Sequence, residues 1–325
     1  MIKSLASLLL KRAGYKITRV PRQPSIQQTT SGTKKDQLVN KIVEDPLNGD
    51  LHLQYSLEAS NSGKPFLAYA ELKTAEYLGA DRGQVAKHAA AFRAALPELK
   101  KMNHNQYFRF ETLASEIIKL GGKSNLSVLD VGGDQGQLSS FIPADYTYCL
   151  VEPTMNGLSG KKLPFHYHSF DYVVSCHVLE HIPVKDRLLF LDQLLSKSKH
   201  GVILLNPFHV EGTHIAERLK LFYEITGAQW AKEHLECTLP KVDELRSYAA
   251  DRGLRFHAKP NGTMTTSMAF VFVDHLAGRA GDFKQLQKIN AFFNEKFIDI
   301  LDSAEYPNAY LVYLGWPEVK KNPSE

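Results

Sequence analysis

The stretch that decides the fold is SVLDVGGDQGQL, residues 127–138. Residues 127–131 form a short apolar run typical of a buried strand, and Gly132, Gly133 and Gly136 turn the chain into the element that follows. In an open α/β sheet the ligand crevice lies beyond the carboxyl ends of the strands, and glycines let a ligand approach the backbone there. The stretch therefore predicts a strand, a glycine turn and a helix that together bind a ligand.

The alternation of short apolar runs and helical patterns continues toward the C-terminus. We predict an opening helix at about 105–120, and strands at 127–131, 146–151, 172–175, 202–206, 254–259 and 309–314. Strands that alternate with helices favour a parallel sheet covered on both faces. We therefore expect an α/β fold with a doubly wound, mostly parallel sheet, preceded by a small all-α domain.

Acidic residues near the glycine turn indicate the kind of ligand. Glu152 follows Asp130 by 22 residues, at the end of the next predicted strand, where a carboxylate accepts hydrogen bonds from both hydroxyls of a ribose. The dinucleotide pattern GxGxxG is not met, because Asp134 and Gln137 stand at the third and sixth positions counted from Gly132. A pyrophosphate is disfavoured beside Asp130 and Asp134, whereas a cationic sulfonium is favoured. The loop therefore favours S-adenosylmethionine.

Four segments in the right order carry a family resemblance: VLDVGGDQG, VEP, LPFHYHSFDYVVSCHVLEHIP and GVILLNPF. From about residue 126 to residue 207 the chain resembles the class I S-adenosylmethionine-dependent methyltransferases, specifically the type 11 group, whose fold is Rossmann-like. The resemblance implies that the glycine turn lines the methionine end of the cofactor, that Glu152 holds the ribose, and that residues 163–165 border the adenine. The cofactor-binding residues so implied are Asp130, Gly132, Gly133, Asp134, Gly136, Glu152, Leu163, Phe165, Ser175 and Cys176.

The sequence departs from the family in two places. Asp134 stands where the family has a glycine, which narrows the turn or supplies a contact to the ammonium group of the cofactor. Only ten residues separate Glu152 from Leu163, so the third strand and the helix before it must be shortened or absent. The assignment of the adenine pocket depends most on this segment.

A proton-accepting residue is needed only if the methyl acceptor carries a proton. His177, Glu180 and His181 lie together where the strand at 172–175 ends, and a histidine with a near-neutral pKa can deprotonate a sugar hydroxyl there. We predict these three as catalytic residues, with His177 the better base; the competing interpretation is that His181 caps or packs the following helix. The helical segment from Arg218 is expected to cover the active site. We predict no metal, although His166 and His168 precede the two histidines.

Residues 36–104 are dense in alanine and leucine at helical spacing. Two antiparallel helices joined at residues 61–65, followed by a third helix near residues 84–96, resemble a single tetratricopeptide-like hairpin. A lone repeat cannot bury its own apolar face, so it must pack on the main domain, on another copy or on a protein partner. We assign residues 1–35 to a basic arm and linker, 105–317 to the methyltransferase domain and 318–325 to a tail.

The first 35 residues carry eight basic and no acidic side chains, which leaves 31 basic and 35 acidic residues in the remainder. The mildly acidic body argues against nucleic acid as a partner. Residues 1–22 include a short amphipathic stretch that cannot span a bilayer but can lie on an anionic leaflet. A frayed basic terminus and an organelle presequence are the competing interpretations.

Composition narrows the class and the compartment. The contents of 43% hydrophobic and 23% charged residues are ordinary for a globular protein and exclude collagen-like, wholly disordered and multi-span membrane proteins. Three cysteines without a CxxC pair give no disulfide framework and favour a reducing compartment. We therefore expect a cytoplasmic protein, peripheral at the inner face of the plasma membrane if the arm binds lipid.

The basic arm before a type 11 domain is similar to methyltransferases of bacterial surface-polysaccharide pathways. This resemblance implies a glycan or glycolipid substrate, O-methylated at a sugar hydroxyl with S-adenosyl-L-methionine as the methyl donor. Two alternatives stay open. One is a noncatalytic interaction protein with a vestigial nucleoside-binding fold, and the other is a nicotinamide-dependent reductase.

Overall fold

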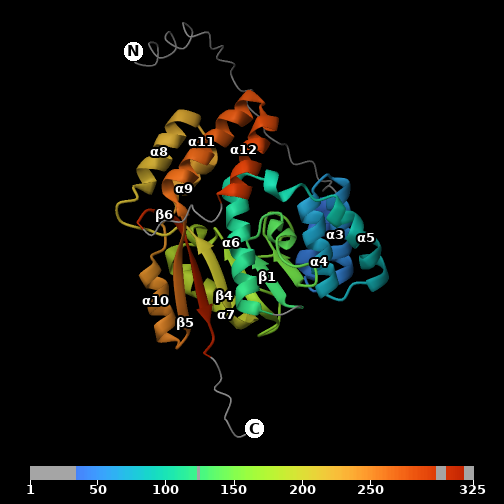
Figure 1. Ribbon diagram of the computed structural model, residues 1–325. Helices are drawn as coiled ribbons and strands as arrows, with labels where there is room; N and C mark the ends of the chain where they lie inside the picture. Colours follow the sequence, from blue (N-terminus) through green and yellow to red (C-terminus); the bar gives the residue numbers. More distant parts are fainter. Residues whose placement is uncertain (1–33, 123–124, 298–304, 318–325) are drawn as a thin grey trace, which may run out of the picture. The chain divides into compact units, whose positions relative to one another are not determined.

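A six-stranded sheet forms the centre of the molecule (Figure 1). The computed structural model describes residues 34–122, 125–297 and 305–317, so the predictions for the N-terminal arm and the C-terminal tail lie outside the described residues. The strands are β1 (Ser127–Val131), β2 (Thr147–Val151), β3 (Phe170–Cys176), β4 (Ser198–Asn206), β5 (Arg255–Thr263) and β6 (Pro307–Gly315). All six predicted strands are confirmed.

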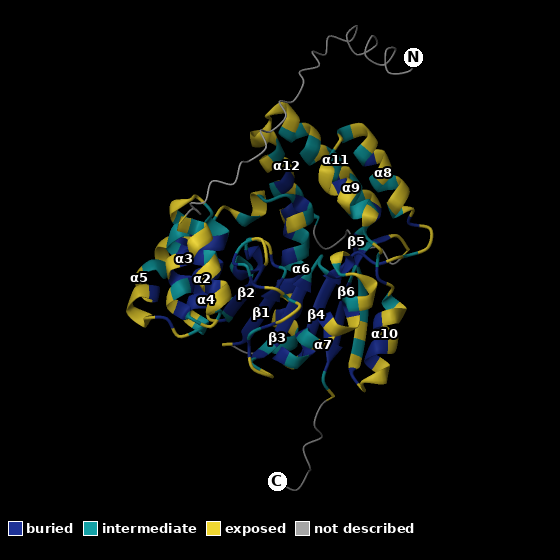
Figure 2. Cartoon of the chain, turned by 180° about the vertical axis from the view of Figure 1, so that it is seen from behind, coloured by how far each residue is buried: buried dark blue, intermediate teal, exposed yellow. Residues whose placement is uncertain are grey.

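The sheet has the order β2-β1-β3-β4-β6-β5. The first four strands of this order are parallel, while β6 runs antiparallel to both β4 and β5. The central strands are buried along nearly their whole length (Figure 2), as expected for parallel strands that helices cover on two faces. The doubly wound, mostly parallel α/β fold predicted from the sequence is therefore confirmed.

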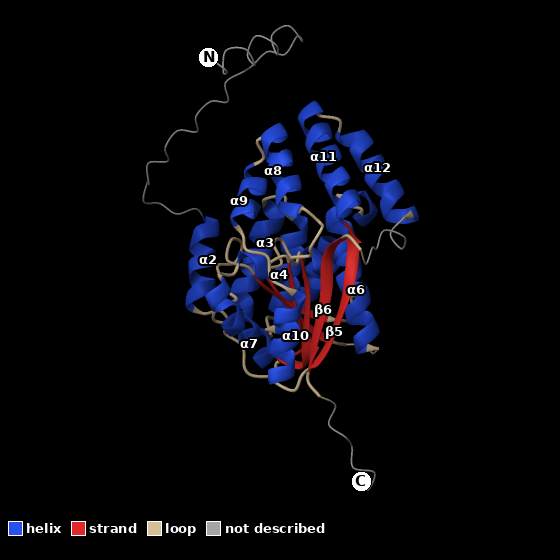
Figure 3. Ribbon diagram, turned by 90° about the vertical axis from the view of Figure 1, so that its left-hand side faces the viewer, coloured by secondary structure: helices blue, strands red, loops and turns tan. Residues whose placement is uncertain are grey.

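Helices surround the sheet on both faces. They are α2 (Lys34–Glu44), α3 (Gly49–Asn61), α4 (Pro65–Tyr77), α5 (Arg82–Ala94), α6 (His104–Gly121), α7 (Arg187–Lys197), α8 (Ile215–Thr226), α9 (Gln229–Glu236), α10 (Val242–Asp251), α11 (Met264–Ala280) and α12 (Phe283–Lys296). Seen along the sheet, α7 and α10 lie on one side of the strands and α6 on the other, while α8, α9, α11 and α12 gather at one end of the molecule (Figure 3). No described helix is long and apolar enough to cross a bilayer.

The helix predicted directly after the glycine turn does not form. In its place the chain makes one 3-10 turn, Gln137–Ser140, and then enters β2. Ala70 of α4 fills the adjacent space, because a Cβ built on Gly136 would lie 2.3 Å from the Ala70 Cβ. The face that this helix would cover is covered by α4 instead.

The third strand inferred to be shortened or absent is indeed missing, and β2 forms the edge of the sheet. Two side chains satisfy the open edge. The backbone N–H of Leu150 donates to the Thr74 hydroxyl at 3.0 Å, and the Asn156 amide donates to the Leu150 carbonyl at 2.9 Å. An edge strand leaves unpaired backbone groups, so α4 and the segment after β2 together replace the pairing that a third strand would provide.

A buried polar network fastens the N-terminal helices to this edge. Glu71 of α4 accepts a hydrogen bond from Asn156 at 2.9 Å and lies 2.6 Å from Nδ1 of His52 on α3. All three side chains are fully buried, and the pairing with Glu71 outweighs burial and raises the pKa of His52. The predicted helical hairpin is present as α3 and α4, and it belongs to the same compact unit as the sheet. Its likeness to a tetratricopeptide repeat and the predicted domain boundaries stay predictions.

Candidate functional site

The turn after β1 accepts only glycine at two positions. Gly132 has a φ of +82°, its N–H donates to the Val151 carbonyl at 2.8 Å, and a Cβ there would lie 2.2 Å from a methyl carbon of Val178. A Cβ on Gly133 would lie 2.3 Å from a carboxylate oxygen of Asp130. The turn therefore lies directly against the end of β1, with no room for side chains.

Asp130 is a buried carboxyl group at the end of β1. The Tyr148 hydroxyl donates to it at 2.7 Å. Burial raises the pKa of Asp130 to about 7, and the nearby Glu152 adds to this effect, although the Tyr148 hydrogen bond opposes it. A positive charge placed beside Asp130 would offset this penalty and favour the ionised form.

Glu152, at the end of β2, is linked to the glycine turn. Its carboxylate accepts hydrogen bonds from the Asp134 N–H at 3.2 Å and from the Thr154 N–H and hydroxyl at 3.0 and 2.8 Å. Asp134 has a φ of +51°, a left-handed conformation that aspartate tolerates better than most residues. Asp134 therefore replaces the family's glycine without changing the kind of turn. The structure brings Asp130, the glycine turn and Glu152 together at adjacent strand ends.

Two of the other predicted cofactor residues belong to the core. Leu163 is buried, and Phe165 packs edge to face on Phe170 with ring centroids 4.9 Å apart. Phe170 begins β3 and Cys176 ends it, so Phe165 lies at the opposite strand end, about 20 Å from the crevice at about 3.3 Å per residue. The structure does not bring Phe165 to the site, because the shortened segment returns directly to the amino end of β3.

Ser175 and Cys176 end β3 next to the glycine turn. The Ser175 hydroxyl donates to the Val131 carbonyl at 2.9 Å, which ties the ends of β3 and β1 together. Burial raises the pKa of the Cys176 thiol to about 12. Cys176 is therefore a neutral thiol at physiological pH, and it can line the site but not act as a nucleophile.

His177 and Glu180 form a buried pair at the end of β3. Nδ1 of His177 lies 3.4 Å from Oε1 of Glu180, whose other oxygen accepts a hydrogen bond from Asn206 at 2.6 Å. Nε2 of His177 is buried with no hydrogen-bond partner among the described residues. Burial, with Arg109 adding to the effect, lowers the pKa of His177 to about 4. The imidazole is therefore neutral, and its Nε2 is free to accept a proton.

The backbone of His177 is also strained. Its φ is +55°, although its N–H still donates to the Leu205 carbonyl at 2.8 Å. A non-glycine residue in the left-handed region is uncommon, and such residues gather at functional sites. The bend turns the chain out of β3 and carries the imidazole to the wall of a cavity.

His181 lies beside Glu180, on the exposed side of this pair. It is exposed, its Nδ1 is 3.4 Å from the Cys237 sulfur, and its ring packs edge to face on His234. Glu180, His181 and His234 each offer a ligand atom, all within 4.8 Å of one another, and they are the residues of the described chain that could hold a metal ion. His166 and His168 are not part of this group.

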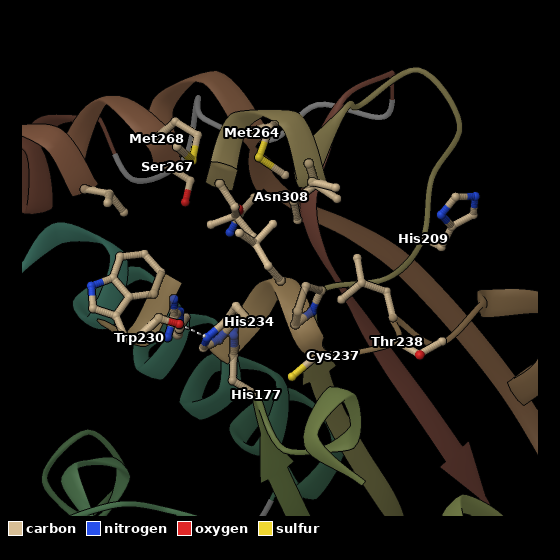
Figure 4. Close-up of a pocket in the computed structure, with 18 of the residues that line it drawn as sticks. His177, His209, Trp230, His234, Cys237, Thr238, Met264, Ser267, Met268 and Asn308 are labelled. Carbon is tan, nitrogen blue, oxygen red and sulfur yellow. Dashed lines mark hydrogen bonds between the residues drawn. The ribbon is translucent and has the colours of Figure 1, made fainter. Parts of the chain in front are cut away.

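A cavity of about 460 Å³ opens beyond the ends of β3 and β4. Figure 4 shows His177, Trp230 and His234 on one side of it and Met264, Ser267 and Met268 of α11 on another. Residues of α8 complete its wall, as expected for the predicted covering helix. Its lining includes Arg109 of α6, which no sequence pattern marked, and Pro207 after β4. The catalytic candidate His177 therefore faces a cavity large enough for a small acceptor.

One family model and several solved structures resemble part of this chain. A family model described as a methyltransferase domain matches residues 105–259. Similar solved structures include the YcgJ protein of Bacillus subtilis, with 15% identity, a TM-score of 0.39 and coverage of 63% of this chain and 98% of that one. Another is phosphoethanolamine N-methyltransferase 2 of Haemonchus contortus in complex with S-adenosyl-L-methionine, with 14% identity, a TM-score of 0.39 and coverage of 64% and 53%.

The plantazolicin methyltransferase BpumL, in complex with SAH, is similar over 80% of this chain and all of its own length, at 11% identity and a TM-score of 0.41. No curated protein matches the chain. The narrower assignment to the type 11 group stays a prediction. Residues 105–259, which include the glycine turn at the end of β1, therefore resemble a methyltransferase domain.

Proposed function

We propose that the chain transfers a methyl group from S-adenosylmethionine to a hydroxyl oxygen of a sugar, in the synthesis of a surface polysaccharide or glycolipid. The observation that carries this proposal is the neutral His177 imidazole, whose unpartnered Nε2 belongs to a residue in the wall of the cavity. An alcohol oxygen needs to lose a proton when it is methylated, whereas a neutral amine can attack without one, so a placed base favours an oxygen acceptor.

The residues at the ends of β1 and β2 fit the cofactor. Gly132, Gly133 and Gly136 carry no side chains, so a ligand can approach the backbone of the turn closely, and a neighbouring positive charge would stabilise the ionised form of Asp130. Glu152 faces the turn with a carboxylate that can accept hydrogen bonds from ribose hydroxyls. When bound, the cofactor supplies a methyl group on a sulfonium that leaves as a neutral thioether.

His177 then performs the proton transfer. Nε2 takes the proton of the acceptor hydroxyl as the new oxygen–carbon bond forms and the sulfur–carbon bond breaks. Glu180, held by Asn206, faces Nδ1 of His177 and stabilises the imidazolium that results. The covering helices exclude water from this step, and alignment supplies much of the rate.

A sugar suits the lining of the cavity. Trp230 offers a flat apolar surface for the ring carbons, while Thr238, Ser267 and Asn308 offer polar atoms for hydroxyl groups (Figure 4). The test is transfer of radiolabelled methyl from S-adenosylmethionine to nucleotide sugars and lipid-linked glycans. Label in a sugar methyl ether supports the proposal, and label only in amines or protein would contradict it.

Two contacts outside the site are part of this proposal. We propose that residues 1–22 hold the protein at the inner face of the plasma membrane, and that the helical hairpin contacts a protein partner through its outer face. Cosedimentation with anionic liposomes should be lost when residues 1–22 are deleted. Equal sedimentation of both forms would remove the membrane contact.

One observation favours the noncatalytic alternative. Both carboxylate oxygens of Glu152 already accept hydrogen bonds, from Asp134 and Thr154, so the ribose must compete with the protein's own backbone. An interaction protein with a vestigial site would bind no S-adenosylhomocysteine, whereas the enzyme must bind it. Calorimetric titration separates the two functions.

A further inference from the structure

Arg109 is a charge that the proposed mechanism does not use. Its side chain extends from α6, its Nε is buried, and Nε has no hydrogen-bond partner in the described part of the chain. Within residues 34–122, 125–297 and 305–317 no carboxylate forms an ion pair with the guanidinium. Burial lowers the pKa of Arg109, yet a guanidinium stays charged in proteins. A partly buried cation without a partner is costly, so its presence favours an anionic ligand.

Arg109 lines two large cavities. One is the cavity of about 460 Å³ that also contains His177, and the other, of about 540 Å³, is lined by Asp274 among others. Trp230 and His234 line both, so the cavities meet beside Arg109. Among the described residues, the lining of the His177 cavity includes Lys241 and Arg109 but no aspartate or glutamate. Its lining therefore favours a negatively charged occupant.

Glu180 does not form an ion pair with Arg109. Glu180 attracts the guanidinium electrostatically, but its oxygens face Asn206 and His177. Arginine binds a carboxylate or a phosphate through two parallel N–H···O hydrogen bonds, which also fix the orientation of the bound group. The free donors of Arg109 are thus available to a ligand in the cavity that His177 faces.

We propose that Arg109 binds a carboxylate or phosphate group of the methyl acceptor and so places the acceptor hydroxyl at His177. This inference rests on the proposed methyl transfer for the identity of the ligand, but not for the anion site itself. It narrows the acceptor class to anionic sugars, such as a uronic acid or a sugar phosphate, and disfavours neutral sugars.

The first experiment measures anion binding without cofactor or catalysis. Inorganic phosphate and acetate, each at constant ionic strength against sodium chloride, are added to the full chain while its melting temperature is recorded. We expect at least one of the two anions to raise the melting temperature, since a ligand that binds only the folded state stabilises it. A response to phosphate alone indicates a phosphate-bearing acceptor, and a response to acetate alone a carboxylate-bearing one.

Three variants complete this experiment. Arg109→Gln should abolish the anion response, Arg109→Lys should retain part of it, and the exposed Arg246→Gln should leave it unchanged. Without added anion, Arg109→Gln should melt no lower than the wild type, because the arginine has no partner to lose. An equal anion response in Arg109→Gln, or no response in the wild type, would overturn the proposal.

The second experiment separates the acceptor from the cofactor, which also carries a carboxylate. S-adenosylhomocysteine should bind Arg109→Gln as tightly as it binds the wild type. A tenfold loss would assign the guanidinium to the cofactor and overturn the proposal. With methyl transfer as the readout, glucuronate or glucose 1-phosphate should outcompete methyl glucoside in the wild type, and Arg109→Gln should remove this preference. If the protein binds anions through Arg109 but transfers no methyl group, the proposed reaction is contradicted and the anion site is not.

Discussion

The Leu150 backbone N–H donates to the Thr74 hydroxyl at 3.0 Å, so a helix side chain supplies the hydrogen bond that a third strand would make. Both groups are buried. This contact, together with Asn156, explains how the sheet ends at β2 without exposing its edge. It also makes α4 a structural part of the sheet that carries the site.

Replacing Thr74 tests this edge. Thr74→Val preserves shape but leaves the Leu150 N–H without its acceptor, and an unsatisfied buried donor costs about 1–3 kcal/mol. We expect a loss of this size in the free energy of unfolding, measured by urea denaturation. Thr74→Ser, which retains the hydroxyl, should lose less, and equal losses in the two variants would show that the hydrogen bond is unimportant.

His177 should control the rate and its pH dependence. His177→Asn keeps a residue that tolerates the left-handed backbone and removes the base, so kcat should fall by about 10²–10⁴-fold. Because the pKa of His177 is lowered to about 4, the wild-type imidazole stays neutral as the pH falls through 6.5. With S-adenosylmethionine saturating, so that the titration of Asp130 does not affect the rate, the acid limb of kcat/KM for the acceptor should therefore lie near pH 4. A limb centred near pH 6.5 would argue against His177 as the buried base.

Asp130 should couple cofactor binding to proton release. Its pKa of about 7 in the free protein falls when a cation binds beside it, so the affinity for S-adenosylmethionine should rise about tenfold from pH 6 to pH 8. Calorimetry in buffers of different ionisation enthalpy measures the protons released. The affinity of Asp130→Asn for S-adenosylmethionine should change little between pH 6 and pH 8. A wild-type affinity that does not depend on pH would contradict the role of Asp130.

Gly133 should be intolerant of a single methyl group. Its φ is not in the left-handed region, so Gly133→Ala acts through the contact of 2.3 Å with Asp130 rather than through backbone strain. We expect at least a tenfold loss in affinity for S-adenosylhomocysteine. Gly278→Ala, in α11 with no atom near its Cβ, is the matched control and should bind normally with about 0.5–1 kcal/mol more stability.

The sequence predicted the strands and the strand-end residues because both depend on local patterns. Apolar runs predicted the six strands, and the order of the glycine turn, Glu152 and His177 along the chain predicted their meeting at adjacent strand ends. The missing helix after Gly136 was not predicted, because α4, which replaces it, comes from a segment more than 60 residues earlier. The predicted position of Phe165 beside the adenine was wrong for a related reason. The number of residues in a loop does not show which end of the next strand the loop reaches.

Arg109 could not be found from the sequence. It lies in an ordinary amphipathic helix, 68 residues before His177, and its neighbours carry no motif. Its importance arises from burial without a partner, which depends on three-dimensional packing. Trp230 belongs to the same class, because α9 reaches the site only through the fold of the covering helices.

The measurement that tests the central claim most directly is isothermal titration of the full chain with S-adenosylhomocysteine, beside Glu152→Ala, Gly132→Arg and the control Gly278→Ala. We predict a dissociation constant on the order of micromolar for the wild type and for the control, and no binding by the other two variants when both remain folded. Absence of binding by the folded wild type, or equal binding by all four proteins, would contradict a cofactor site at the ends of β1 and β2.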